Sequence, residues 1–339
     1  MLFFLRDQAL VRLLDDSQVR VTRARSKADL LEVLDRLEIF PGGLEFDHVQ
    51  SIALLVLAIA SFAALLLMDD MGVMFWVGLA CCFFSYYVRK GLSGSLTGLA
   101  SNIARKCALF SNDLSEVDSD ADWCLKRLNN EFVDYDRGNE RRYIVESIQG
   151  IYHGVRHSLA FEYYHLQYVS SRSERGAGGS YNTVYETFSR YSLVLDFPWV
   201  RGISALTDPQ ERSLTGRRFK VDCDDFNQAF VLRGSDQACC TSFATPAIQL
   251  FLMGLARRLE KVNLEFSSQG RLCLSFDDAE VMAYADPGPL SDLPSFRERI
   301  KAGIELPGLY PILELVHRLA ELQEPAPEFS LVVAEGIGQ

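Results

Sequence analysis

The sequence contains none of the short motifs that mark the common catalytic and nucleotide-binding sites. It has no P-loop, no dinucleotide-binding fingerprint, no nucleophile elbow and no zincin pair of histidines. Its eight cysteines include no paired C-x-x-C and no spacing typical of a zinc or redox site. Such cysteines are typical of free thiols in a cytoplasmic domain. The sequence therefore predicts no cofactor and no particular reaction, and it favours a protein without catalysis of its own.

An excess of basic residues is also lacking. Residues 91–339 carry 25 Lys and Arg against 34 Asp and Glu, a net charge of −9. A nucleic-acid backbone repels an acidic domain of this kind. The charge therefore disfavours a nucleic-acid partner, and we expect none.

Two long apolar runs lie back to back near the start of the chain. Residues 52–68 form a run of 17 and residues 71–88 a run of 18, and only Asp69 and Asp70 separate them. In one continuous helix these carboxylates would lie at mid-membrane, where each costs about 3 kcal/mol. A turn at this point keeps both in water, so we expect a two-helix transmembrane hairpin over residues 49–90. The alternative is a buried helical hairpin in a soluble core.

The basic residues beside the hairpin predict its orientation. The short connection between the runs has none, whereas Arg89 and Lys90 follow the second run directly and Arg105 and Lys106 lie close behind. Positive residues remain on the cytoplasmic side of a membrane. The expected location is the inner (cytoplasmic) membrane of the cell, with two spans and both termini in the cytoplasm.

Outside the hairpin the chain predicts an α+β fold with a mixed β-sheet in the cytoplasm. Residues 1–48 form a helical segment, in which Ser26 and Asp29 resemble a capping box. This segment is a membrane-surface helix, a partner-binding arm or a small helical cap; the sequence leaves these three open. The expected divisions that follow are a helical connector (91–137), a β-rich domain (138–290), and C-terminal helices with a tail (291–339).

The β-rich domain begins with a long predicted hairpin. Residues 158–169 and 181–197 are rich in aromatic and β-branched residues and flank a Gly/Ser-rich loop, residues 170–180. Shorter strands are expected over 218–221, 230–232, 238–242, 263–267 and 271–276. A helix starts at Pro246 with Thr245 as its cap, and another covers residues 309–320.

A longer pattern in this domain resembles a known family. An element with Phe226, Phe230 and Val231 is followed by Asp236, Ala238 and then Thr245-Pro246 opening an amphipathic helix. With the two apolar runs, this is similar to the uncharacterised bacterial membrane family called domain of unknown function 3137. The resemblance covers roughly residues 52–322 and departs at Ala244, where the family has leucine. It implies a fold and a LemA-type membrane protein as a partner, but no activity and no catalytic residues.

Three histidines form the densest group of ligating side chains. His153, His157 and His165 are separated by even numbers of residues, so one straight strand would place them on one face. That arrangement could hold a metal ion. The other interpretation, which we favour, is that they fill ordinary strand positions.

Two further groups carry polar chemistry. Acidic side chains lie at expected strand ends, where two carboxylates could share acid–base work or simply form solvated turns; they are Asp222, Asp224, Asp225, Asp277 and Asp278. The loop 170–180 carries Arg172 and Arg175, which could bind a phosphate or a partner, or belong to an exposed hairpin tip.

These observations favour a membrane-anchored interaction or scaffold module whose partners are the lipid bilayer and another protein. The alternative is a membrane-bound enzyme or metal-binding protein that uses His153, His157 and His165. Convergence of these histidines with a carboxylate in one pocket would distinguish the two.

Overall fold

The computed structural model describes residues 2–41, 43–44, 46, 48–65, 71–175, 181–209 and 216–324. The chain divides into two compact units. Unit 1 comprises Met1–Asp113 and Tyr284–Leu306, and unit 2 comprises Leu114–Ala283 and Pro307–Gln339. The chain thus leaves unit 1, builds most of unit 2, returns for one short segment and finishes in unit 2.

Unit 1 is helical. Its helices are α1 (Leu2–Arg23), α2 (Lys27–Glu38), α3 (Val49–Leu65), α4 (Met71–Ser111) and α9 (Leu293–Ala302). The predicted capping box is confirmed: Ser26 Oγ accepts from Asp29 N, and Asp29 Oδ2 accepts from Ser26 N. Buried side chains of α2 and α9 form part of the core, including Leu30, Leu34, Phe296 and Ile300. Apolar positions at helical spacing explain these contacts.

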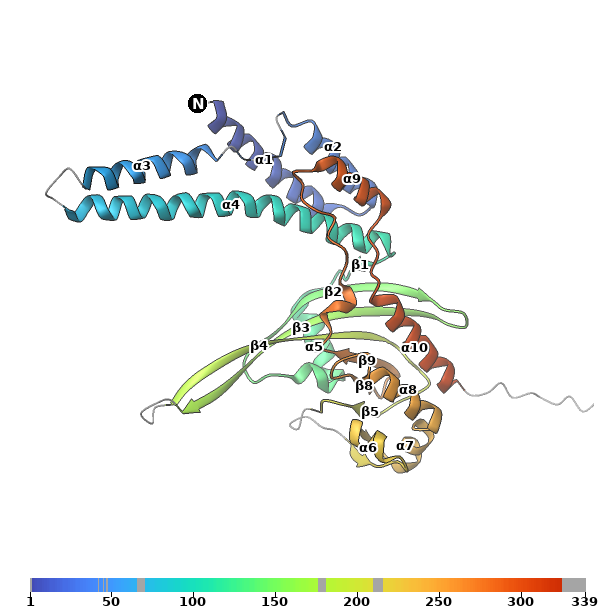
Figure 1. Ribbon diagram of the computed structural model, residues 1–339. Coiled ribbons are helices and arrows are strands. Elements are labelled where there is room, and N and C mark those ends of the chain that lie inside the picture. The colour runs from blue at the N-terminus through green and yellow to red at the C-terminus, as the bar shows by residue number, and fades with distance from the viewer. Residues whose placement is uncertain are drawn as a thin grey trace, which may run out of the picture. The chain divides into compact units, whose positions relative to one another are not determined.

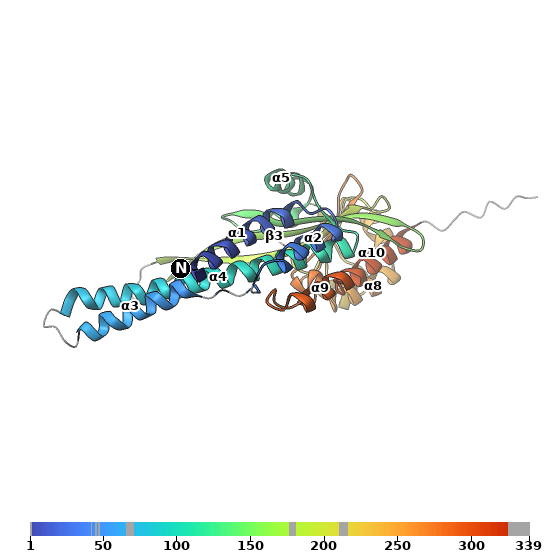
Figure 2. The same ribbon diagram turned by 90° about the horizontal axis from the view of Figure 1, so that it is seen from above.

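Helices α3 and α4 lie side by side in both ribbon views (Figures 1 and 2). The Ser51 and Ser85 hydroxyls are 2.8 Å apart and join the two helices. Gly78 permits the close approach, because a Cβ there would lie 2.8 Å from the Phe62 ring. Large apolar side chains remain exposed on the pair, among them Ile59 and Trp76.

The prediction that these helices form a membrane-spanning hairpin is wrong. Among the described residues, no single helix is both long and apolar enough to cross a membrane. The apolar part of α3, Gln50–Ala64, is shorter than the roughly 20 residues that a 30 Å hydrocarbon core requires. In α4 the apolar residues run directly into Arg89 and Lys90. The predicted inner-membrane location, with both termini in the cytoplasm, is contradicted by the same finding.

The predicted turn at Asp69-Asp70 lies outside the described residues. In unit 2, α7 (Gln237–Phe243) and α8 (Pro246–Ala256) are long and apolar enough for a span only when both helices are taken together across a 72° bend. Since Ile248, Leu252 and Leu255 of α8 are buried, α8 belongs to the protein core.

Unit 2 is built on a nine-stranded sheet in the order β1-β2-β3-β4-β9-β8-β5-β7-β6. The strands are β1 (Ser115–Glu116), β2 (Arg142–His153), β3 (Ser158–Arg175), β4 (Tyr181–Asp196), β5 (Ile203–Leu206), β6 (Arg217–Phe219), β7 (Val231–Gly234), β8 (Asn263–Phe266) and β9 (Arg271–Phe276). Every pairing in the order is antiparallel. The expected mixed sheet is therefore wrong, although the predicted long hairpin (β3–β4) and the strands predicted at β8 and β9 are confirmed.

Helices accompany both faces of this sheet. They are α5 (Ala121–Glu131), η1 (Val133–Asp136), α6 (Asp224–Ala229), α7 (Gln237–Phe243), α8 (Pro246–Ala256), η3 (Ala279–Met282) and α10 (Leu309–Gln323). The expected strand over 238–242 is instead α7, because the Asp236 carboxylate caps a helix by accepting from Cys239 N at 2.8 Å.

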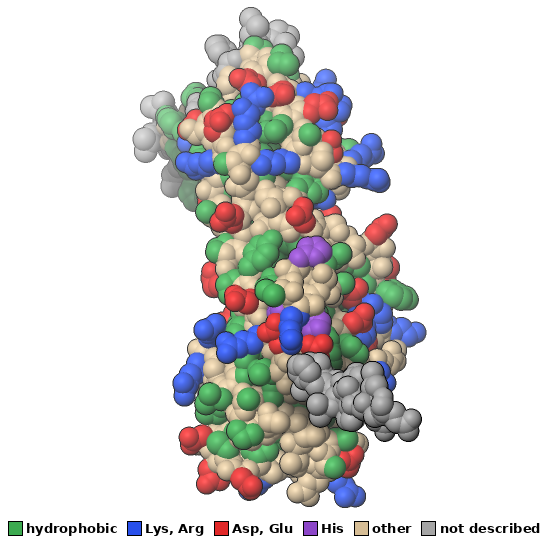
Figure 3. All heavy atoms as spheres, turned by 90° about the vertical axis from the view of Figure 1, so that its right-hand side faces the viewer, with side chains coloured by type: hydrophobic (Ala, Val, Ile, Leu, Met, Phe, Trp, Pro, Cys, Tyr) green, Lys and Arg blue, Asp and Glu red, His purple; other side chains and the backbone are tan. Residues whose placement is uncertain are grey.

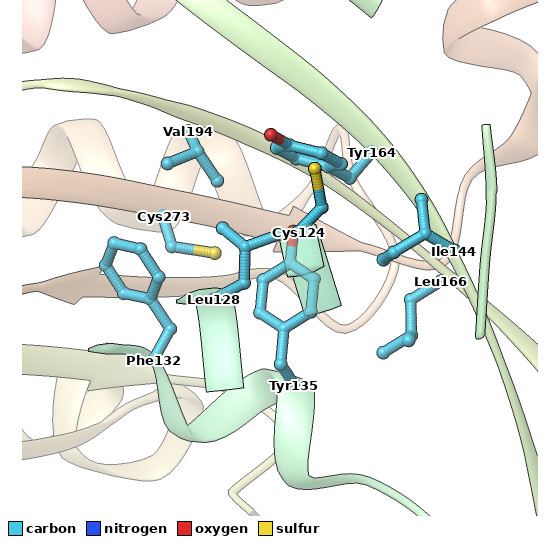
Figure 4. Packing of buried hydrophobic residues seen from close by; sticks show 9 residues of the cluster. All are labelled: Cys124, Leu128, Phe132, Tyr135, Ile144, Tyr164, Leu166, Val194 and Cys273. Atoms are coloured by element: carbon cyan, nitrogen blue, oxygen red, sulfur yellow. The ribbon is translucent and has the colours of Figure 1, made fainter. Parts of the chain in front are cut away.

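The sheet has a core on each side. On one face, side chains of α5 and η1 meet those of four strands (Figure 4); the cluster is Cys124, Leu128, Phe132, Tyr135, Ile144, Tyr164, Leu166, Val194 and Cys273. On the other face, Leu255 of α8 and Val316 of α10 pack over Leu264 and Leu274. Because both faces of the sheet are covered, the residues of β8 and β9 are almost continuously buried.

Candidate functional site

Strands β3 and β4 continue together beyond their neighbours in the sheet (Figure 1). They pair from Phe161↔Leu195 to Arg175↔Tyr181, whereas β2 pairs with β3 only up to Tyr168 and β9 pairs with β4 only from Tyr191 onward. We call residues 169–175 and 181–189 the arm. Aromatic and β-branched residues at alternating positions favour this extended structure.

The β3 edge of the arm is covered. Val169 N donates to Arg141 O at 2.8 Å, and Glu140 N donates to Val169 O at 3.2 Å. Farther along, Ser171 N donates to the Asn139 side chain at 2.7 Å. The segment before β2 thus satisfies the backbone of β3 as far as Ser171.

The β4 edge of the arm is open: no strand in the described part of the chain pairs with residues 181–189 on the side away from β3. In an antiparallel ladder, alternate residues point their N–H and C=O to the same side. Phe197 N, directly after β4, donates to Gly270 O. The backbone N–H and C=O groups of the odd-numbered residues of β4 therefore point toward the β9 side, away from β3. Val169 N donates to Arg141 O and therefore points away from β4. Because Val169 pairs with Thr187, the N–H of Thr187 points away from β3, which agrees with this assignment.

The sequence of this open edge lacks the residues that usually prevent an edge strand from pairing with another chain. Residues 181–189 contain no Lys, Arg, Pro or Gly, which are the residues that usually prevent pairing at an edge. The single charged side chain, Glu186, is paired with Arg172 at 2.9 Å. Tyr181 is 73% exposed and Tyr185 64% exposed. The edge combines outward backbone groups with apolar side chains, which is what strand addition requires.

The predicted histidines do not share one site. β2 ends at His153, β3 begins at Ser158, and His157 lies in the turn between them. His153 Nδ1 is 3.2 Å from Ser158 Oγ, and His165 Nε2 is 3.0 Å from Ser189 Oγ. Burial lowers the pKa of His165.

His157 instead meets a histidine that the sequence did not indicate. Their rings are 5.8 Å apart, and His317 Nε2 accepts hydrogen bonds from the backbone N–H groups of Arg156 and His157. Glu324 Oε2 lies 3.3 Å from His157 Nε2. Figure 3 shows histidines on one face, one of them close to acidic and basic side chains. A histidine among the apolar positions of α10 was the available signal for His317.

The contacts of His157 and Arg156 with His317 hold the β2–β3 turn against α10. In the part of the chain that the structure describes, no group of three or more His, Cys, Asp or Glu could hold a metal ion. The histidine-based metal site therefore gains no support from the geometry.

A second group missed by sequence reasoning is a buried ionic network centred on Asp134. Its carboxylate accepts from Arg190 Nε at 2.7 Å and from Arg137 Nε at 2.8 Å. Asn263 Nδ2 also donates to it at 3.0 Å. All four side chains are almost completely buried. Burial raises the pKa of Asp134, but Arg190 and Arg137 outweigh it and lower the pKa to about 2.

Only one of the predicted aspartates joins this network. Asp277 Oδ1 accepts from Arg190 Nη1 at 2.8 Å, while Asp278 accepts from Glu260 N at 2.7 Å. Asp224 and Asp225 lie in the first turn of α6, and Asp222 precedes it. The predicted acids thus do not converge on one catalytic pair. Every network carboxylate has donors, which is typical of a structural role.

The loop arginines have ordinary surroundings where they are described. Arg172 pairs with Glu174 and Glu186, each at 2.9 Å. Arg175 is the last residue of β3, and residues 176–180 lie outside the described ranges. The predicted phosphate contact at this loop gains no support.

Comparison with known proteins adds no further assignment: no family model, no curated protein and no solved structure matches this chain. The resemblance to domain of unknown function 3137 stays a prediction.

Proposed function

We propose that this chain is an interaction module that binds an extended segment of another protein as an added strand along β4. The observation that carries the proposal is the contrast between the arm's two edges. The β3 edge is covered by residues 139–141, while the β4 edge leaves a row of outward backbone groups with no strand beside it among the described residues. Long unprotected edges of this kind are templates for another strand.

The side chains of the arm indicate the chemistry of the partner segment. A strand added beside β4 would place its side chains next to Tyr181 and Tyr185 on one face, and next to Val184 and Phe188 on the other. Cross-strand pairs of this kind favour aromatic and β-branched residues. Glu186 is already paired with Arg172. We therefore expect a segment of four to eight mainly uncharged residues that is extended when bound. The family resemblance makes a LemA-type protein one candidate to supply it.

The test uses peptides selected for binding. Dodecapeptides displayed on phage are selected against the full chain, and the affinities of synthetic binders are measured by calorimetry. Thr187→Pro removes an outward N–H without touching the ladder to β3, so binding weakens about tenfold or more. Thr187→Val keeps the N–H and serves as the matched control, with unchanged binding.

Two outcomes contradict the proposal. One is a set of tight binders whose affinity is the same for Thr187→Pro and Thr187→Val. The other is a dimer of the full chain in sedimentation experiments that Thr187→Pro dissociates, because the edge would then be occupied by a second copy. Unchanged amide exchange at Val184 and Glu186 in Thr187→Pro shows that the arm remains folded.

A further inference from the structure

Unit 1 contains a cavity of about 810 Å³ that the proposed strand addition does not involve. One wall is a single face of α4, where the hydroxyl side chains Ser93, Thr97 and Ser101 recur at intervals of four residues. The facing wall is residues 284–291, the segment by which the chain returns to unit 1. The volume is within the range of small-molecule sites, about 300–1,000 Å³.

The wall formed by residues 284–291 is held in place. Arg299 Nη1 donates to Pro287 O at 2.7 Å, and Asp286 Oδ1 accepts from Gly288 N at 2.8 Å. Gly288 has a φ of +90°, a conformation that favours glycine. Because these contacts fix the loop, the cavity is preformed.

The remaining lining residues include a strained one. His48 has a φ of 53°, and its Nδ1 atom is buried without a hydrogen-bond partner among the described residues. Both features are energetically unfavourable. Residues with a strained backbone cluster at binding sites, and a buried polar atom without a partner is another feature of such sites. His48 lies against Phe46, with ring centroids 6.2 Å apart.

The charge of the lining selects the ligand. Asp286 is the one acidic residue among the described lining residues, which include no Lys or Arg, and the nearby Arg299 donates to Pro287 O. Aromatic rings of Phe46 and Tyr284 line the same cavity, with Leu96 and Leu290 as apolar surface. A carboxylate together with aromatic rings recognises an ammonium group. We propose that this cavity binds a small amphiphilic amine, with its ammonium group at Asp286 and its apolar body along α4.

The test compares three probes of equal chain length by calorimetry on the full chain: octylamine, octan-1-ol and octanoate. Octylamine binds at least about tenfold more tightly than octanoate, because only the ammonium group is attracted by Asp286. Asp286→Asn keeps the hydrogen bond from Gly288 N but removes the charge, so octylamine loses this advantage while octan-1-ol is unaffected. Asp292→Asn, directly after this segment and outside the cavity lining, leaves octylamine binding unchanged.

A second pair of variants tests the location. Ser101→Trp fills the cavity and abolishes octylamine binding, whereas Asn102→Trp, at the neighbouring exposed position outside the lining, retains it. Equal affinity for octylamine and octanoate would overturn the proposal. So would octylamine binding that survives both Asp286→Asn and Ser101→Trp.

Discussion

Two buried carboxylates of unit 2 have pKa values that are shifted in opposite directions. Asp134 has two guanidinium partners and a pKa of about 2, whereas Glu265 accepts from the N–H groups of Val133 and Asp134 and has no such ion pair in any described contact. Burial, followed by repulsion from Asp134, raises the pKa of Glu265 to about 7. Glu265 therefore gives unit 2 a contribution to stability that depends on pH near neutrality.

The sign of this dependence follows from the raised pKa. Between pH 4.5 and about 7 the folded protein holds a proton on Glu265 that the unfolded chain has released, so stability falls as the pH rises. Glu265→Gln cannot ionise and removes this contribution. We expect the stability of the natural protein relative to Glu265→Gln to fall by about 3 kcal/mol between pH 4.5 and 8. Urea unfolding at several pH values measures it.

The control for this prediction is Glu260→Gln, which changes an exposed carboxylate. Its unfolding free energy should remain parallel to that of the natural protein over the same pH range. Parallel curves for Glu265→Gln as well would show that Glu265 has an ordinary titration.

At the residue scale, the sequence did not predict contacts between residues that lie far apart in the chain. Even spacing placed His153 and His165 on one face only if they shared a strand, and the turn at residues 154–157 separates them. His317, which does meet His157, is 160 residues away from it. The Asp134 network likewise joins residues from η1, β4 and β8, and no local sequence pattern predicts these contacts.

At the scale of elements, the β2–β3 turn and α10 are held together by close packing. A Cβ at Gly154 would lie 2.2 Å from His317 Cδ2. Gly154→Ala therefore forces the turn or α10 to move, and we expect a loss of about 1–3 kcal/mol in the free energy of unfolding. Chemical denaturation of the two proteins measures the difference.

Gly254→Ala is the matched control for this substitution. Gly254 lies inside α8, and a Cβ there meets nothing within 4 Å. Alanine is the better helix former by up to about 1 kcal/mol, so this variant should be slightly more stable. Equal effects of the two substitutions would contradict the packing described for Gly154.

Locally encoded elements were predictable. The capping box of α2 and the Thr245-Pro246 start of α8 involve residues within four positions of one another. The order of the sheet was not predictable, because β4 pairs with β9 and β5 pairs with β8, and both pairings join residues far apart in the chain. The apolar length of α3 and α4 was overestimated, since the helices as described do not meet the requirement for a span.

At the scale of the whole molecule, the chain has two units with separate cores. Leu30 is completely buried in unit 1, and Arg190 is 2% exposed in unit 2. Because domains generally unfold as units, we expect two thermal transitions. Leu30→Ala should lower one of them, and Arg190→Met, which removes a guanidinium partner of Asp134, should lower the other, by about 3–5 kcal/mol of stability.

Differential scanning calorimetry of the full chain distinguishes this from a single cooperative transition. If both substitutions lowered the same transition equally, the units would not unfold separately. No local pattern predicts that residues 284–306 belong to unit 1, since this return depends on packing between segments far apart in the chain.

Amide hydrogen exchange of the full chain, resolved to single residues, tests strand addition at β4 most directly. In the free protein, Thr183, Tyr185 and Thr187 should exchange quickly, while the alternate residues Val184 and Glu186, bonded to β3, exchange slowly. A selected peptide should slow exchange only at the odd-numbered positions. Slow exchange of Thr183, Tyr185 and Thr187 without peptide, or peptide protection confined to other parts of the chain, would contradict the account.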